Sequence, residues 1–187
     1  PFETEYVQTS KMLKGDEKIV TEGVNGELKH TAKVVFFNGQ EVSREIIATE
    51  QTVETVNQVI KQGTFEAEKG KLTIGDGVIV TADGDVYTYT HTMKAKATAY
   101  THTDAGCDKI TATGTTVHWG TVAVDPKLIP YGTKMFIVSN DGKYVYGLSA
   151  AEDCGGSIKG NRIDLYMPTT KQCFSFGVRN CTIYFLG

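Results

Sequence analysis

The chain has 187 residues, of which 40% are apolar and 22% charged, and its formal net charge is −3. This composition is typical of globular protein and argues against wholesale disorder. No apolar run approaches the roughly 18 residues of a membrane-spanning helix, and the slight negative charge argues against a nucleic-acid partner. The chain begins at Pro1 without a signal-peptide pattern, so we expect a processed or trimmed fragment.

Charge and cysteine are distributed unevenly along the chain. Residues 1–94 carry 15 acidic and 10 basic side chains, whereas residues 95–187 carry 7 acidic and 9 basic ones. All four cysteines lie in the second half, which contains a single glutamate, Glu152. A shift this sharp near the midpoint predicts two domains. We expect a module over 1–66, a linker or connecting hairpin over 67–94, and a second domain over 95–187.

Most of the chain is expected to form β-strands. Thr, Val and Tyr favour strands, and Gly next to Asn or Asp favours the turns between them. Three pairs of apolar or alternating runs are separated by Asn-Gly or Asp-Gly sequences, which is a strong local hairpin signal. These predicted hairpins are Lys33–Phe37 with Glu41–Ala48, Val78–Thr81 with Val86–Thr90, and Met135–Val138 with Tyr144–Leu148.

Two segments show helical features. Apolar residues in Thr52–Lys61 follow a helix-like spacing, but the segment is rich in β-branched residues, which weakens the prediction. Thr169–Phe176, closed by Gly177, is the better candidate for a short helix.

The four cysteines leave two interpretations open. No two of them are closer than eight positions and no CxxC motif occurs, which disfavours a zinc ribbon or a thioredoxin-like site. They are either four buried thiols or two disulfides in an exported protein, and the even count favours disulfides. Four cysteines allow three pairings, and the sequence alone does not choose among them. The cysteines are Cys107, Cys154, Cys173 and Cys181.

The first 66 residues contain no cysteine and no plausible catalytic pair. Five glycines punctuate them, in the segments KGDEKIVTEGVNGE, VVFFNGQEVSREII and IKQGT. This pattern resembles the five-glycine (G-five) domain of bacterial cell-surface and cell-wall proteins. The resemblance implies a thin, extended all-β module without a thick core, which adheres to glycans containing N-acetylglucosamine or acts as a spacer. Tyr6, Phe36 and Phe37 are candidates for stacking on sugar rings, or alternatively core residues.

Three aspartates in the second half each follow or flank an apolar strand. Asp125 lies in TVAVDPKLIPYGT, Asp153 in YGLSAAEDCGGSIKG and Asp164 in NRIDLYM. If they converge, mutual repulsion and burial raise at least one pKa, and a carboxyl group that stays protonated near neutral pH can act as a general acid. A cluster of acids without a nearby histidine fits glycosidic-bond chemistry better than acyl transfer. Alternatively, each aspartate shapes a turn or pairs with a neighbouring cation.

The motifs AVDP-x-x-IP-x-GT and A-x-D-x-GG-x-IKG-x-x-ID resemble the bacterial 3D domain, named for its three aspartates. The match runs from about Ala97 to Leu186 and is similar to the catalytic barrel of lytic transglycosylases of the membrane-bound A type and to stationary-phase survival and resuscitation-promoting muralytic domains. It implies an all-β fold in which a six-stranded double-psi β-barrel follows the G-five module. It also implies a secreted or wall-associated bacterial enzyme that cleaves peptidoglycan glycan strands without hydrolysis, cofactor or metal. We expect a monomer, and the sequence leaves open whether the protein serves spore germination, growth or wall turnover.

In such a reaction one carboxyl group protonates the glycosidic oxygen between N-acetylmuramic acid and N-acetylglucosamine. The same group then takes the proton of the muramic C6 hydroxyl, which closes on C1 to give a 1,6-anhydro product. We expect Asp153 to be this acid/base because the adjacent glycines leave room for a sugar, with Asp164 and Asp125 tuning its pKa and stabilising the cation.

Several further residues are expected near the site. The predicted substrate-binding residues are Thr113, Gly114, Gly155, Gly156 and Lys159, and His102, His118 and Trp119 either line the cleft or lie on loops. Cys154 departs from the family pattern, and the pairing hypothesised here joins Cys154 to Cys107 and Cys173 to Cys181.

Three alternatives to the enzyme stay open or are set aside. A non-catalytic glycan-binding module on the same barrel, as in expansin-like proteins, is the main rival, and a wall-anchoring fragment that needs a partner domain is another. An aspartic protease would need two facing motifs of the type seen at Asp153-Cys154-Gly155, and only one is present.

Overall fold

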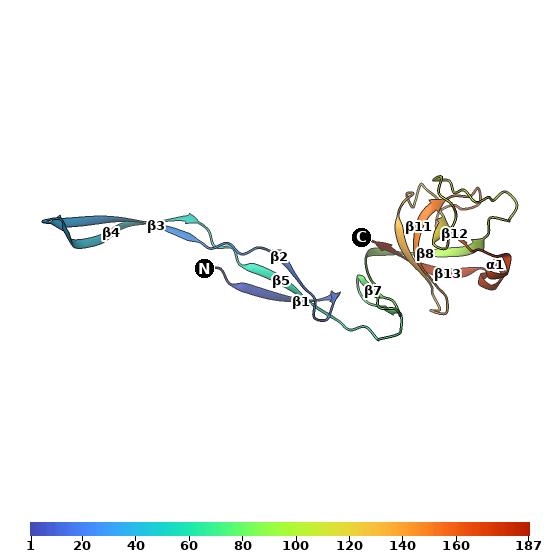
Figure 1. Cartoon of the computed structure of the whole chain (residues 1–187), viewed down its shortest axis with the longest axis horizontal. Coiled ribbons are helices and arrows are strands. Elements are labelled where there is room, and N and C mark those ends of the chain that lie inside the picture. Colours follow the sequence, from blue (N-terminus) through green and yellow to red (C-terminus); the bar gives the residue numbers. More distant parts are fainter. The chain divides into compact units, whose positions relative to one another are not determined.

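The computed structural model describes all 187 residues and contains thirteen strands and one short helix (Figure 1). The predicted all-β fold is therefore confirmed. The chain divides into two compact units, Pro1–Asp76 and Gly77–Gly187. No helix is long and apolar enough to cross a membrane.

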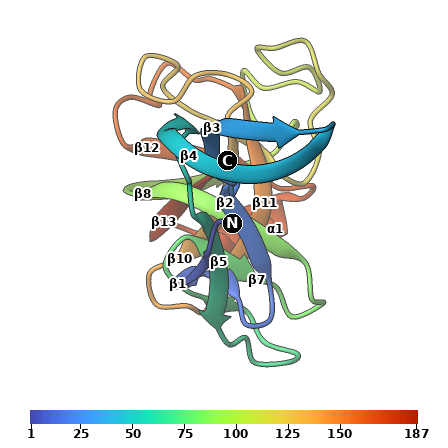
Figure 2. The same cartoon turned by 90° about the vertical axis from the view of Figure 1, so that its left-hand side faces the viewer.

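The first unit consists of two small sheets. In the three-stranded sheet β5 lies between β1, to which it is parallel, and β2, to which it is antiparallel, while β3 and β4 form a separate antiparallel ribbon. The ribbon is strongly twisted, as two-stranded sheets are (Figure 2). The strands are β1 (Thr4–Leu13), β2 (Glu17–Thr21), β3 (Glu27–Phe37), β4 (Gln40–Val53) and β5 (Gln58–Phe65).

This unit has almost no interior. Gly63 is its only buried residue, and a Cβ added there would collide with the backbone of Leu13, so the close approach of β5 to the end of β1 requires glycine. The expected thin module without a thick core is what the structure contains. Tyr6, Phe36 and Phe37 are all exposed, which excludes the alternative that they form a core.

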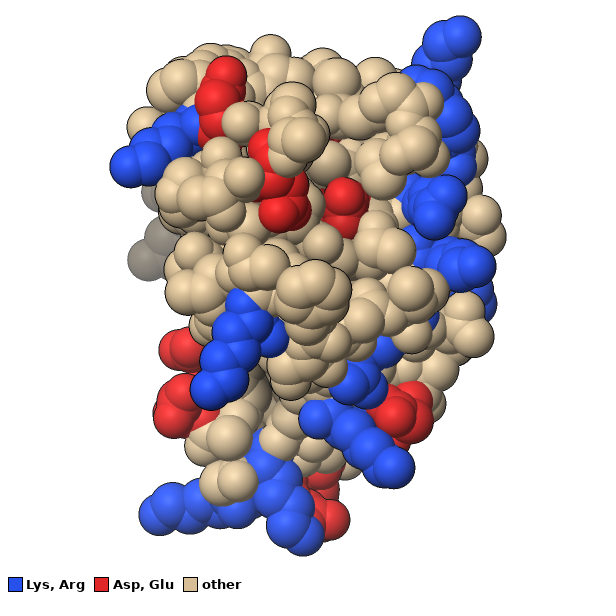
Figure 3. Space-filling view, turned by 90° about the vertical axis from the view of Figure 1, so that its right-hand side faces the viewer, with Lys and Arg blue, Asp and Glu red and all other residues tan.

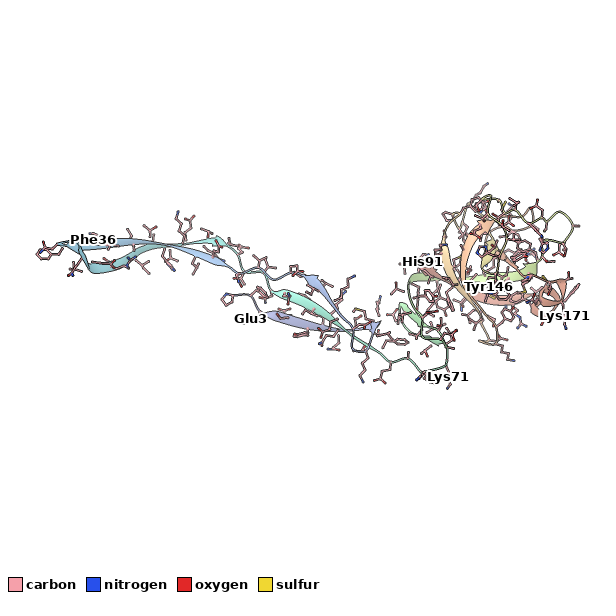
Figure 4. The ribbon with its side chains drawn as sticks, in the orientation of Figure 1. Glu3, Phe36, Lys71, His91, Tyr146 and Lys171 are labelled. Atoms are coloured by element: carbon pink, nitrogen blue, oxygen red, sulfur yellow. The ribbon has the colours of Figure 1, made fainter.

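Local sequence explains most of the ribbon but misleads at β5. The Asn38-Gly39 turn has positive φ at both residues, 50° and 81°, as a two-residue hairpin turn requires, and it confirms the first predicted hairpin. Phe36 projects close to this turn (Figure 4). The helix-like spacing in Thr52–Lys61 was misleading, because this β-branched segment is extended: it ends β4 at Val53 and begins β5 at Gln58.

The second unit is built around a closed ring of six strands. In this ring β12 pairs with β9, β9 with β11, β11 with β10, β10 with β13, β13 with β8, and β8 again with β12. The ring agrees with the expected six-stranded barrel. The elements from residue 73 onward are β6 (Thr73–Ile74), β7 (Val78–Val80), β8 (Val86–Tyr100), β9 (Thr121–Ala123), β10 (Lys134–Ser139), β11 (Val145–Asp153), β12 (Arg162–Tyr166), α1 (Thr170–Phe176) and β13 (Arg179–Leu186).

The barrel encloses the main hydrophobic core. Side chains of alternate strand positions fill it, because successive residues of a strand point to opposite faces of a sheet. The buried core residues include Ala95, Ala97, Val122, Met135, Ile137, Ile163, Leu165 and Ile183. Tyr146 lies among the barrel strands (Figure 4).

The remaining local predictions are confirmed. The pairs β7–β8 and β10–β11 form the second and third predicted hairpins. The helix α1 begins after Thr169, whose hydroxyl accepts from the backbone of Gln172 in a capping box, and it ends at Gly177. Phe176 at its end is buried in the barrel core.

Candidate active site

Two of the three predicted aspartates lie in one row across the barrel. Asp153 at the end of β11 and Asp164 in β12 are both register partners of Ala123 in β9, and Asp164 is in turn the partner of Thr98 in β8. Register partners share a face of a sheet. On β8, β9 and β12 the neighbouring positions enter the main core, so this row, which we call the acid row, faces away from it.

A cavity of about 330 Å³ opens over the acid row. Asp153, Asp164 and Ala123 lie in its lining together with Tyr100. Two loops complete its walls, one after β8 and one between β11 and β12. They contribute Ala105, Gly106, Cys107, Asp108, Ile110, Cys154, Gly155, Gly156, Ser157 and Ile158.

Asp153 is held by three hydrogen-bond donors. The Tyr100 hydroxyl donates to Oδ2 at 2.8 Å, and the backbone N–H groups of Ala112 and Cys154 donate to Oδ1 at 3.1 and 2.9 Å. Burial and the neighbouring Asp153 raise the pKa of Tyr100 well above its ordinary value, so this hydroxyl keeps its proton and remains a donor. Asp153 is thus fixed as an acceptor at one end of the acid row.

Asp164 has a different environment. The Thr98 hydroxyl donates to its Oδ1 at 2.7 Å. Burial raises the pKa of Asp164, and the Thr98 hydrogen bond and the positive charge of Arg162 only partly oppose this effect. Asp164 is therefore protonated more readily than an ordinary aspartic acid.

Asp125 does not join the other two aspartates. It is absent from the cavity lining, and its carboxylate accepts the backbone N–H groups of Lys127 at 3.1 Å and Gly160 at 2.9 Å. These bonds lower the pKa of Asp125. The expected convergence of three carboxyl groups therefore needs correction: Asp125 follows β9 on a turn, where it fastens the end of the β11–β12 loop.

The predicted substrate-binding residues divide into two groups. Gly155 and Gly156 line the cavity. Thr113 and Gly114 lie on the turn before β9, where the N–H of Thr113 donates to the carbonyl of Glu152 at 3.1 Å. Lys159 is exposed near the end of the β11–β12 loop, and its charge acts on Asp125. None of these last three residues lines the cavity.

The cysteines are free thiols, so neither hypothesised disulfide is formed. Cys181 is buried in the barrel core, where thiols behave as small apolar groups, and Cys173 packs against the same core. Cys107 and Cys154 line the cavity as exposed thiols. Burial and the surrounding aspartates raise the pKa of Cys107, which keeps it in the thiol form.

Sequence reasoning missed Tyr100 and Thr98, which bind the two carboxyl groups directly. The available signal was that Thr98 and Tyr100 alternate along β8 with the small apolar residues Ala97 and Ala99, which pack on the core side. Of the other aromatic and histidine candidates, His102 bonds the Tyr166 hydroxyl at 2.9 Å. His118 and Trp119 line a separate cavity of about 640 Å³, away from the aspartates.

Comparison with known proteins agrees with both resemblances. Residues 1–65 match the G5 domain and residues 120–187 match the 3D domain. The chain therefore carries a G5 domain match followed by a 3D domain match, and residues 66–119 lie outside both.

Two curated relatives come from Bacillus subtilis. YabE, named as a cell wall shaping protein, is 33% identical over 192 residues, which is 99% of this chain and 46% of YabE. The cell wall-binding protein YocH is 36% identical over 89 residues, which is 46% of this chain and 29% of YocH. The chain thus spans less than half the length of either relative.

Two solved structures of the Escherichia coli lytic transglycosylase MltA are also similar. One is an apo form of an MltA variant and the other is MltA itself, with TM-scores of 0.36 and 0.37. Each is 22% identical and covers 45% of this chain and 29% of MltA.

Proposed function

We propose that this protein is a lytic transglycosylase of the bacterial cell wall, which cleaves the bond between N-acetylmuramic acid and N-acetylglucosamine to give a 1,6-anhydro product. The acid row is the observation that carries the proposal. It combines two carboxyl groups in one open cavity, one with a raised pKa and one fixed by three donors. Enzymes that cleave glycosidic bonds commonly use two carboxyl groups whose environments differ.

The environments assign the two roles. Asp164, whose pKa burial raises, donates the proton to the glycosidic oxygen as the bond to C1 breaks. Asp164 then carries the negative charge and accepts the proton of the muramic C6 hydroxyl, whose oxygen forms the new bond to C1. Asp153, held as an acceptor, stabilises the positive charge that develops on the sugar. This assignment replaces the sequence-based expectation that Asp153 is the acid.

The relatives named as cell wall shaping and cell wall-binding proteins support an extracytoplasmic, wall-associated location and peptidoglycan as the partner. The binding protein YocH also favours the second candidate function, a 3D domain that holds glycan without cleaving it. The two candidates differ in one observable, which is the formation of anhydro products.

The test digests purified peptidoglycan with the full chain and analyses the released sugars by mass spectrometry. Wild type is expected to release anhydro-muramic products, and Asp164→Asn is expected to lower their rate by about 10²–10⁴-fold, the usual contribution of a general acid. Asp83→Asn, the same substitution in the β7–β8 turn, serves as the matched control and should leave the rate unchanged.

Binding is measured in parallel by cosedimentation. Wild type that binds peptidoglycan but releases no product would establish the glycan-binding candidate instead. Products that carry a reducing muramic acid would establish hydrolysis.

A further inference from the structure

A pair of basic residues adjoins the acid row on the same face of the barrel. Arg162 and Lys96 are register partners in the parallel pair β12–β8, two residues before the partners Asp164 and Thr98. Side chains two positions apart on a strand share a face and lie about 6.6 Å apart. Both basic residues are exposed, and Lys94 lies two positions before Lys96 on β8. Figure 3 shows a column of basic side chains along one edge of one face of the molecule, and acidic side chains both in its upper middle and at other edges.

Neither side chain of the pair is neutralised by a direct ion pair, although the charge of Arg162 acts on Asp164. Neither Lys96 nor Arg162 forms a salt bridge in the structure. Like charges directly opposite each other on neighbouring strands destabilise a sheet. Lys94, by contrast, donates to the Thr182 hydroxyl at 2.7 Å and so has a local partner. The side chains of Lys96 and Arg162 are available for an external anion.

The backbone holds the pair in place. The N–H of Lys96 donates to the carbonyl of Asn161 at 3.0 Å, and the N–H of Arg162 donates to the carbonyl of Lys159 at 3.3 Å. The amide of Asn161 also reaches the carbonyl of Lys94 at 3.4 Å. Because these bonds use main-chain atoms, substitution of either basic side chain leaves them intact. The backbone positions of Lys96 and Arg162 therefore do not depend on their charges.

We propose that Lys96 and Arg162 form an anion subsite that binds carboxylates of the peptide stem carried by the substrate's muramic acid. The inference rests on the proposed function, because that function places a muramic acid bond at Asp164. Two positions along a strand separate Asp164 from the basic pair by about 6.6 Å, which is close to the length of one sugar ring. The stem is attached to the muramic ring itself, so its carboxylates are the anions that a strand bound at the acid row brings with it.

The chemistry of the pair fits a carboxylate. The guanidinium of Arg162 offers a planar set of donors that matches the two oxygens of a carboxylate, and the ammonium of Lys96 adds a second charge beside it. The subsite would select glycan strands with peptide stems over strands without free carboxylates.

The test compares binding of the full chain to three preparations of insoluble peptidoglycan. One is free of teichoic acid, the second is the same material with its carboxylates amidated, and the third retains its phosphate-rich teichoic acid. We expect wild type to bind the first about three- to tenfold more tightly than the second, as two exposed ion pairs would give. Added salt should reduce this difference because it screens exposed charges.

The double variant Lys96→Gln, Arg162→Gln should bind the first two preparations equally. The matched control Lys134→Gln, Lys143→Gln loses the same charge elsewhere on the barrel and should behave as wild type. Thermal unfolding checks that the double variant retains its fold.

Three results would overturn the inference. Wild type could bind amidated and unmodified peptidoglycan equally, or the double variant could remain as sensitive to amidation as wild type. The double variant could also bind more weakly than wild type only to the preparation that retains teichoic acid. The last would show that phosphate is the ligand. Anhydro products are measured separately, so failure of the transglycosylase proposal is recorded independently of the binding result.

Discussion

At the scale of single residues, the surrounding groups give Asp153 and Asp164 different properties. Both carboxyl groups flank Ala123, yet burial dominates at Asp164 while donors converge on Asp153. The sequence identified both aspartates, because apolar strands around an acid suggest a half-buried carboxyl group. The expectation that Asp153 is the acid did not take account of Tyr100 and the Ala112 N–H, which lie 53 and 41 positions away from Asp153.

The raised pKa of Asp164 makes a prediction about stability. The native state binds this proton more tightly than the unfolded chain, whose aspartic acids titrate near the ordinary value of 3.8. The free energy of unfolding should therefore fall as the pH rises from that value through the raised pKa. Asparagine does not ionise and can still accept from Thr98 through its oxygen.

We expect Asp164→Asn to be more stable than wild type at pH 7 and to lose this advantage at acid pH below 3.8. Urea unfolding at a series of pH values measures the difference, with Asp83→Asn as the reference. A variant that is less stable than wild type at pH 7 would show that the carboxylate of Asp164 is a favourable charge in the native protein.

At the scale of elements, local signals predicted local structure. Asn38-Gly39 specifies a hairpin and Thr169 with Gln172 specifies a helix start, because the interactions that form them span only a few residues. The closure of the barrel through β8–β12 and β9–β12 joins strands far apart in sequence, and only the family resemblance predicted it. The contact by which Asp125 fastens the β11–β12 loop was not predictable for the same reason: its partner Gly160 is 35 positions away.

Asp125 holds the β11–β12 loop and should affect turnover only through the position of that loop. Asp125→Asn replaces one carboxylate oxygen with an amide, so one of the two backbone donors, Lys127 or Gly160, loses its acceptor. We expect the rate of product formation to fall only about two- to tenfold, the effect of one hydrogen bond. Release of anhydro products by this variant and by Asp164→Asn, under identical conditions, measures the contrast. Loss of activity as large as that of Asp164→Asn would place Asp125 among the reacting groups.

At the scale of the whole molecule, the uneven sequence corresponds to two kinds of construction. The acidic first unit buries a single glycine, whereas the second unit buries an apolar barrel core. In the ribbon both faces are exposed, so its charged side chains remain in water. In the second unit the barrel core partly buries the carboxyl groups of the acid row. The shift in composition predicted two domains. It did not predict which residues would line the cavity.

The two constructions should differ in local stability. Backbone hydrogen bonds that are exposed to water open more readily than those over a packed core. In hydrogen exchange followed by mass spectrometry, amides of β10 and β13 should exchange most slowly and those of β3 and β4 much faster. Equal protection of the ribbon and the barrel would contradict the absence of a core in the first unit.

The central claim is that a hydroxyl of the substrate, and not water, attacks the anomeric carbon. Digestion of purified peptidoglycan by the full chain in water enriched in heavy oxygen tests it most directly, because hydrolysis places a solvent oxygen on C1 of the muramic sugar and transglycosylation does not. The account predicts anhydro-muramic products without the heavy isotope, released by wild type and nearly absent with Asp164→Asn. Muramic ends that carry heavy oxygen, or the absence of any cleavage by wild type that binds the substrate, would contradict it.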